Sequence, residues 1–408
     1  MTDAVLGLRA NWRQFALLVA LNAVVGAMAG LERSVVPLLG ERDFGVDSKG
    51  AILLFVLAFG VAKACANLAT GPLAQRLGRR RVLVLGWVCM APVPALVGLA
   101  PGWWLVVAAN VLLGAGQGLA WSMTVVMKID LAGPRRRGLA LGLNESSGYL
   151  GVAAAALLTG LAAGWVAPRT AVWVGAAALA AVGLAVSGGL VRDTGAHVAA
   201  EQRGSLQADE PRAVLVACSQ AGLANNLNDA LAWGLVPVYL AAHGASVGQV
   251  GAVAAAYPAV WGVAQVGTGW LSDHAGRKPL IVAGMLVQAG ALALLAAGKG
   301  GFGVSLVAAV LLGLGTALVY PTLIAAVSDA VQPVRRAHAV GAYRFWRDTG
   351  LAAGALVAGL TADAAGARAA IVVVGLLTAA SGLWVLATPW RRPSAVPIAA
   401  ISNGQLER

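Results

Sequence analysis

Apolar runs of about 20 residues recur from one end of the chain to the other, with short polar segments between them. Each run is long enough to cross a hydrocarbon layer of about 30 Å as a helix. Strands are disfavoured, because the runs are rich in Ala, Leu and Gly and do not alternate in polarity. The pattern predicts an all-α integral membrane protein of about twelve transmembrane helices, at residues 15–37, 50–70, 82–100, 103–127, 139–163, 170–190, 213–241, 248–270, 279–298, 303–327, 338–361 and 368–388.

A polar stretch at residues 191–212 divides these runs into two sets of six. It is too polar to span a membrane and is interpreted as a cytoplasmic linker. We therefore expect an N-terminal six-helix bundle at 1–190, the linker at 191–212, a C-terminal six-helix bundle at 213–388 and a cytoplasmic C-terminal tail at 389–408.

A short motif is repeated at corresponding places in the two sets. The segment from Gly71 to Arg80, GPLAQRLGRR, matches the segment from Gly269 to Lys278, GWLSDHAGRK, at an offset of 198 residues. Such a repeat predicts two halves related by a pseudo-twofold axis along the membrane normal. A solute pathway is then expected between the halves, near the middle of the membrane.

The repeated loop lies between the second and third spans of each half and resembles the signature loop of the major facilitator superfamily (MFS). The resemblance implies the twelve-helix fold of that family, transport by alternating access, and a loop that latches the two halves in one state. It assigns this gating role to Gly71, Gln75, Gly78 and Arg79 in the first copy, and to Gly269, Asp273, Gly276 and Arg277 in the second.

The sequence departs from the family pattern at three places. Gln75 stands where the first loop usually has Asp, which weakens a charge-dependent latch there. Gly114 stands where many proton-linked antiporters have Arg, and the fifth span lacks the Gly-Pro pair of the drug-efflux branches. A multidrug antiporter is therefore a poorer match than the superfamily as a whole.

Composition and charge support a membrane protein. Of the residues, 59% are apolar and only 11% are charged, whereas soluble proteins average about 25% charged. The net charge of +12 does not indicate nucleic acid, because the basic residues form short clusters between the apolar runs. This positive-inside pattern predicts a membrane protein with both termini in the cytoplasm. Together with the family resemblance, it leads us to expect a protein of the bacterial cell inner membrane.

Two carboxylates at membrane depth are the candidate proton carriers. Ionisable residues there are costly unless paired or hydrated, which makes them candidates for function. Glu145 lies about 10 Å inside the fifth span, and Asp229 lies in the seventh. The repeat places Arg344 of the eleventh span opposite Glu145, which suggests a gating pair; a purely structural ion pair is the alternative.

Polar residues of other spans are the candidate substrate ligands. Asn225, Asn228 and Asp229 are three and four positions apart and share a helix face, which lines the cavity or forms an inter-helix hydrogen-bond network. Arg344 and Arg347 also share a face, and guanidinium groups suit carboxylates, so an anionic or zwitterionic solute is weakly favoured. The predicted substrate-binding residues are Arg344, Arg347, Asn225, Asn228, Gln117, Asn144 and Tyr343.

The sequence favours a transporter over an enzyme. It contains no metal-ligand spacing, nucleophile motif or phosphate-binding loop, so no cofactor or metal is expected. We predict a monomeric secondary active transporter of a small polar solute, coupled to protons or another ion. Drug efflux by proton antiport and, from another class, a non-transporting membrane sensor are the alternatives. The transport direction, and whether Glu145 and Arg344 form a gate or serve the substrate, stay open.

Overall fold

The computed structural model describes residues 4–45, 49–162, 167–204 and 212–390. Within these residues the chain is helical, with no strand. Residues 205–211 of the predicted linker and the predicted tail after residue 390 lie outside the described residues. The all-helical fold predicted from the apolar runs is confirmed.

The helices form two bundles joined by a short helix. The N-terminal bundle comprises α1 (Trp12–Arg42), α2 (Lys49–Leu77), α3 (Arg79–Met90), α4 (Val93–Gly98), α5 (Trp103–Ala132), α6 (Arg137–Ala162) and α7 (Pro168–Gly189). The C-terminal bundle comprises α9 (Arg212–Ala230), α10 (Val236–Ala242), α11 (Val247–Ala275), α12 (Arg277–Ala297), α13 (Phe302–Asp329), α14 (Arg336–Ala365) and α15 (Ala367–Ala387). Between the bundles lies α8 (Gly195–Gly204).

Two of the predicted spans are interrupted, and prolines explain both interruptions. The third span divides into α3 and α4 around Pro92 and Pro94, which lack the backbone N–H that would continue the helix. In the seventh span a π-helical segment, Leu231–Leu235, comes directly before α10 and its Pro237. Such π segments are frequent at functional sites, and this one lies next to Asp229.

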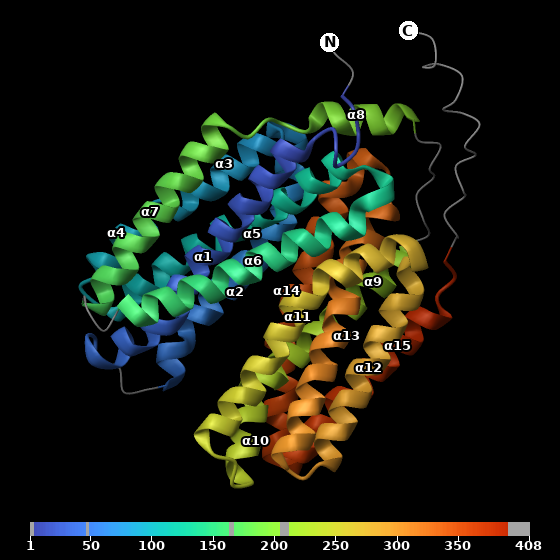
Figure 1. Cartoon of the computed structure of the whole chain (residues 1–408). Coiled ribbons are helices and arrows are strands. Elements are labelled where there is room, and N and C mark those ends of the chain that lie inside the picture. The colour runs from blue at the N-terminus through green and yellow to red at the C-terminus, as the bar shows by residue number, and fades with distance from the viewer. Residues whose placement is uncertain (1–3, 46–48, 163–166, 205–211, 391–408) are drawn as a thin grey trace.

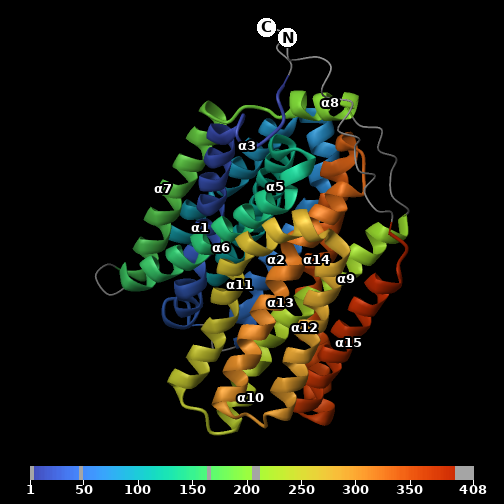
Figure 2. The same ribbon diagram turned by 45° about the vertical axis from the view of Figure 1, so that its right-hand side comes forward.

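The two bundles meet along two symmetry-related helix pairs. α2 packs against α14 and α6 packs against α11, as Figures 1 and 2 show. A Cβ atom added at Gly142 of α6 would collide with the carbonyl oxygen of Gln265, and one added at the equivalent Gly341 of α14 would collide with that of Asn67. Glycine at these two positions therefore lets the backbones of opposite bundles approach closely.

Apolar side chains cover the outer surfaces of the bundles, as contact with lipid requires. Leu360 and Leu376 are exposed on α14 and α15. Among the described residues, nine helical spans are long and apolar enough to cross a membrane. The other long helical segments, α6, α9 with α10, and α14, carry Glu145, Asp229 and Arg344.

α8 lies across the end of the molecule at which α1 begins (Figure 1). The turns after α2, α5, α11 and α13 lie at the same end, called here the α8 end. In the two copies of the repeated loop, Gly78 and Gly276 form the turns with φ angles of 85° and 88°. Only glycine adopts this left-handed region without a steric penalty, so these two glycines are required by the turn.

Candidate functional site

Glu145 is the centre of a buried polar site between the bundles. Its side chain is fully buried on α6. The Trp121 indole N–H donates to both carboxylate oxygens at 3.2 Å, and the Asn144 amide donates to Oε1 at 2.8 Å. All three residues belong to the N-terminal bundle. From the other bundle, Nη1 of Arg344 lies 3.6 Å from Oε1 of Glu145, so this ion pair spans the interface.

A second group of charges surrounds Arg347 on α14. Its Nη1 lies 2.8 Å from Oδ1 of Asp348, and its Nη2 lies 3.8 Å from Oδ2 of Asp229. The hydroxyl of Tyr257 donates to Asp229. The amide of Asn67 on α2 donates to Asp348 Oδ2 at 2.9 Å, so this group also crosses between the bundles.

Several buried cationic nitrogen atoms in this region have no hydrogen-bond acceptor. They are Nε and Nη1 of Arg344, Nε of Arg347 and Nζ of Lys128. The Lys128 side chain is fully buried on α5, which packs against α6, the helix of Glu145. Lys128 is not among the predicted site residues, although a lysine between Met127 and Ile129, within an apolar run, is a usable signal.

Four of the predicted ligands contact neighbours inside their own bundle. The amide of Asn228 donates to Gln288 at 2.6 Å and its oxygen accepts from Thr378 at 2.9 Å, while Asn225 accepts from Gln288 at 3.0 Å. Both asparagines thus belong to an inter-helix network inside the C-terminal bundle, the alternative weighed for this face. The remaining two are Gln117, which donates to the Val25 carbonyl, and Tyr343, which packs at Gly222.

The two copies of the repeated loop make unequal contacts at the α8 end. In the second copy, Asp273 accepts hydrogen bonds from the backbone N–H groups of Gly138 at 2.8 Å and Leu139 at 2.9 Å. These groups form the N-terminus of α6, where a carboxylate is favourable, so the contact joins the bundles. Gln75, at the equivalent place in the first copy, is exposed.

The other loop residues hold the loops in place or allow close contact. Arg79 pairs with Asp130 at 2.7 Å, and the equivalent Arg277 pairs with Asp329 at 2.9 Å. A Cβ atom at Gly71 would collide with the backbone of the facing α14, and one at Gly269 would collide with that of α6. Both loops are therefore seated against the opposite bundle.

The linker helix α8 takes part in the same closure. Glu201 of α8 pairs with Arg137 of the N-terminal bundle and with Arg336 of the C-terminal bundle, the latter at 2.8 Å. Arg336 also reaches Asp130 across the interface at 2.9 Å, and Arg137 reaches Asp329 at 2.5 Å. These buried ion pairs close the α8 end of the structure. The sequence predicts the linker only as a polar connection and does not indicate these ion pairs.

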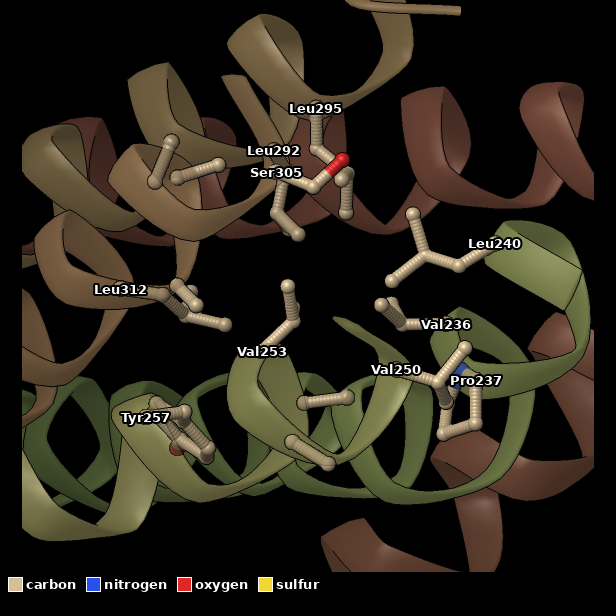
Figure 3. Close-up of a pocket in the computed structure, with 15 residues that line it drawn as sticks. Val236, Pro237, Leu240, Val250, Val253, Tyr257, Leu292, Leu295, Ser305 and Leu312 are labelled. Carbon is tan, nitrogen blue, oxygen red and sulfur yellow. The ribbon is translucent and has the colours of Figure 1, made fainter. Parts of the chain in front are cut away.

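A small cavity inside the C-terminal bundle is a weaker candidate for a solute site. It lies between α10, α11, α12 and α13 and has a volume of about 20 Å³, enough for a single water molecule. Figure 3 shows Val236, Val253 and Leu292 at its walls and Tyr257 at its edge. No charged side chain lines it, so an ionic solute would find no partner there.

Comparison with known protein families identifies the class of protein. The model of the Major Facilitator Superfamily matches residues 15–215 and 219–403, which is most of the chain. The chain therefore belongs to this family. It is an integral membrane transporter and not an enzyme, as the sequence predicted. Transporters of this family bind small-molecule solutes and act as monomers.

One relative and several solved structures are similar to this chain. A probable 4-methylmuconolactone transporter of Cupriavidus pinatubonensis is 30% identical over 135 residues, covering 33% of this chain and 29% of the relative. The chain thus matches less than a third of that relative's length.

The solved structures extend over most of the chain. The human organic anion transporter MFSD10 has a TM-score of 0.73 at 19% identity, over 91% of this chain and 99% of its own. The Escherichia coli fucose:proton symporter FucP has a TM-score of 0.71 at 15% identity, over 91% and 97%. A double-tryptophan mutant of the transporter XylE has a TM-score of 0.79 at 12% identity. The match covers 93% of this chain and 96% of the mutant's chain. At these identities the similarity shows the fold alone.

Proposed function

We propose that this protein is a proton-coupled carrier of a small organic anion, with Arg344 as the ligand of the solute's anionic group and Glu145 as the proton carrier. The single observation that carries the proposal is the incomplete pairing of Arg344. Its buried Nε and Nη1 have no hydrogen-bond acceptor, although Glu145 lies 3.6 Å away. Oxygen atoms of an anionic solute would supply the missing acceptors.

The charge balance of the site supports an anionic solute. With every group ionised, four cations face three carboxylates, which leaves one positive charge for an anionic group. The cations are Lys63, Lys128, Arg344 and Arg347, and the carboxylates are Glu145, Asp229 and Asp348. A lipophilic cation would add to this positive charge, so the drug-efflux alternative is less well supported. The names of two similar proteins, an organic anion transporter and a probable 4-methylmuconolactone transporter, support an organic solute.

Coupling follows from competition for Arg344. The solute's carboxylate and Glu145 are both acceptors for the same guanidinium, and two carboxylates close together do not both stay ionised. When the solute binds Arg344, Glu145 is released and takes up a proton. Its Trp121 and Asn144 contacts belong to its own bundle, so they persist when the bundles separate. The carrier then moves one proton with one anion, and Asp229 beside Arg347 is the second candidate proton carrier.

We propose that the α8 end faces the cytoplasm of a bacterial cell and that the protein is a monomer in the inner membrane. Basic residues concentrate at this end, as the positive-inside rule requires. They include Arg76, Arg79, Arg80, Arg81, Arg135, Arg136, Arg137, Arg277, Lys278, Arg335 and Arg336. The ion pairs of α8 then form the cytoplasmic gate. The predicted domain limits at 1–190, 191–212 and 213–388 follow the same division and are kept as part of this proposal.

A thermal-shift screen of small organic anions and lipophilic cations on the purified protein, at pH 5.5 and pH 7.5, tests the proposal. We expect stabilisation by anions, stronger at the lower pH because protonated Glu145 releases Arg344. Arg344→Ala should abolish the shift, and Glu145→Gln should make it equal at both pH values. Arg81→Ala, which removes an exposed arginine, is the control and should bind like the wild type. Stabilisation by lipophilic cations alone, unchanged in Arg344→Ala, would restore the drug-efflux reading.

A further inference from the structure

Five aromatic rings meet between the bundles beside the two arginines, and are called here the aromatic cluster: Trp121, Tyr149, Tyr257, Trp261 and Tyr320. The centroid of Tyr149 lies 5.5 Å from that of Trp121, 4.3 Å from that of Trp261 and 6.3 Å from that of Tyr320. Trp261 in turn lies 5.8 Å from Tyr320 and 6.0 Å from Tyr257. Tyr149 of the N-terminal bundle thus joins rings of the C-terminal bundle.

The arginines of the site lie on the faces of these rings. Cζ of Arg347 is 4.0 Å from the centroid of Tyr320, and Cζ of Arg344 is 5.8 Å from that of Trp121. Two guanidinium groups therefore lie at the margin of the packed rings. A surface built in this way offers a charged end for a carboxylate and ring faces for a planar group attached to it.

Two rings of the cluster carry buried polar atoms without a partner. Nε1 of Trp261 and Oη of Tyr320 are buried without any hydrogen-bond partner. Leaving such donors unpaired in a low-dielectric interior is costly, whereas Phe or Leu would fill the same space at no such cost. Two unpaired donors beside Arg344 and Arg347 indicate a site that receives an oxygen-bearing ligand.

We infer that the transported anion is a carboxylate carried on a flat, unsaturated ring that bears a further oxygen atom. This inference rests on the proposed function and narrows its solute class. The carboxylate binds Arg344, the ring lies against Trp261 and Tyr320, and the second oxygen accepts from Nε1 of Trp261 or Oη of Tyr320.

Tyr149 is the side chain that would move to make room for the ring of the solute. Trp121, Tyr257, Trp261 and Tyr320 are at most 3% exposed, whereas Tyr149 is only partly buried. Its hydroxyl is held by Arg347 at a long distance of 3.4 Å. A planar solute that displaces the Tyr149 ring takes over its contacts with the facing rings, so the packed cluster and solute binding are two states of one site.

A matched pair of anions tests whether the site prefers a solute with a flat ring. Benzoate and cyclohexanecarboxylate have the same charge and carbon number, and only benzoate is flat. In binding to the purified full-length protein at pH 5.5, we expect benzoate to bind at least about tenfold more tightly. Equal binding of the two anions would overturn this inference and leave the proposed function standing. Binding of neither anion, nor of any other organic anion, would instead refute the proposed function itself.

A second comparison tests whether the Tyr320 hydroxyl and the Trp261 ring contact the solute. 4-Hydroxybenzoate should bind more tightly than benzoate to the wild type, and Tyr320→Phe should reduce this preference without weakening benzoate. Tyr239→Phe is the matched control, because Tyr239 is also buried with an unpaired hydroxyl but lies on α10, outside the cluster. Equal effects of the two substitutions would overturn the assignment of Tyr320 as a solute ligand. Trp261→Leu should remove the preference for the flat ring, and an unchanged preference would contradict the ring contact.

Discussion

Replacing Asp273 by asparagine should open the α8 end. The carboxylate accepts two backbone hydrogen bonds at 2.8 and 2.9 Å from the N-terminus of α6 in the opposite bundle, and it pairs with Arg277 at 2.8 Å. Asparagine keeps the size and one acceptor oxygen but loses the charge. Because the Arg277 guanidinium keeps Asp329 as a partner, the main loss is in the contact between the bundles.

The expected magnitude follows from these contacts. A hydrogen bond to a charged group contributes about 1.5 to 3 kcal/mol, and the side chain of Asp273 is only 3% exposed. We expect the closed state to lose about 2 to 3 kcal/mol relative to the open state, which lowers the closed-to-open ratio about 30- to 150-fold. The contact is made only when the α8 end is closed, so the change appears as a shift in conformation.

Double electron–electron resonance measures this shift as a change in the distance between two spin labels, one on each bundle. Arg135 and His274 are exposed at the α8 end of opposite bundles, and cysteines there can be labelled in a background without the native cysteines. Asp273→Asn should add a population at longer distance. Gln75→Ala, the equivalent position in the first loop, should leave the distance distribution unchanged. An unchanged distribution in Asp273→Asn, or an equal shift in both variants, would refute the unequal-latch reasoning.

Three further predictions concern buried positions. Lys128→Met should raise the unfolding free energy by about 1 kcal/mol or more, because it removes an unpaired buried cation, yet slow anion uptake; unchanged uptake would remove Lys128 from the site. Gly71→Ala should open the α8 end in the same resonance assay, since its Cβ meets α14, whereas Gly60→Ala, in open space on the same helix, should not. Asn228→Ala should lower the free energy of unfolding by about 1 to 3 kcal/mol without changing the solute affinity. A changed affinity would show that Asn228 is a solute ligand.

The fold and one central contact could be predicted from the sequence. Apolar runs determine where helices cross the membrane, and the repeated glycines Gly78 and Gly276 mark turns that need a left-handed backbone. The internal repeat also placed Arg344 opposite Glu145, because a pseudo-twofold axis brings equivalent positions of α6 and α14 to the interface. Symmetry thus supplied a long-range contact that local patterns do not contain.

Other features of the site depend on tertiary packing. The spacing of Asn225 and Asn228 shows that they share a helix face, but not whether that face turns to the solute pathway or to α12 and α15. The role of Glu201 arises only when α8 lies across both bundles. The sequence does not indicate which residue lies near Lys128, because its proximity to Glu145 follows from the packing of α5 against α6.

Uptake into proteoliposomes under an imposed proton gradient tests whether anion transport is coupled to protons through Glu145. With a radiolabelled organic anion chosen from the binding screen, we predict that the wild type accumulates the anion when the lumen is alkaline relative to the outside. Glu145→Gln should lose this accumulation while still exchanging external for internal anion without a gradient. Accumulation that is independent of the proton gradient, or that persists in Glu145→Gln, would contradict proton coupling through Glu145.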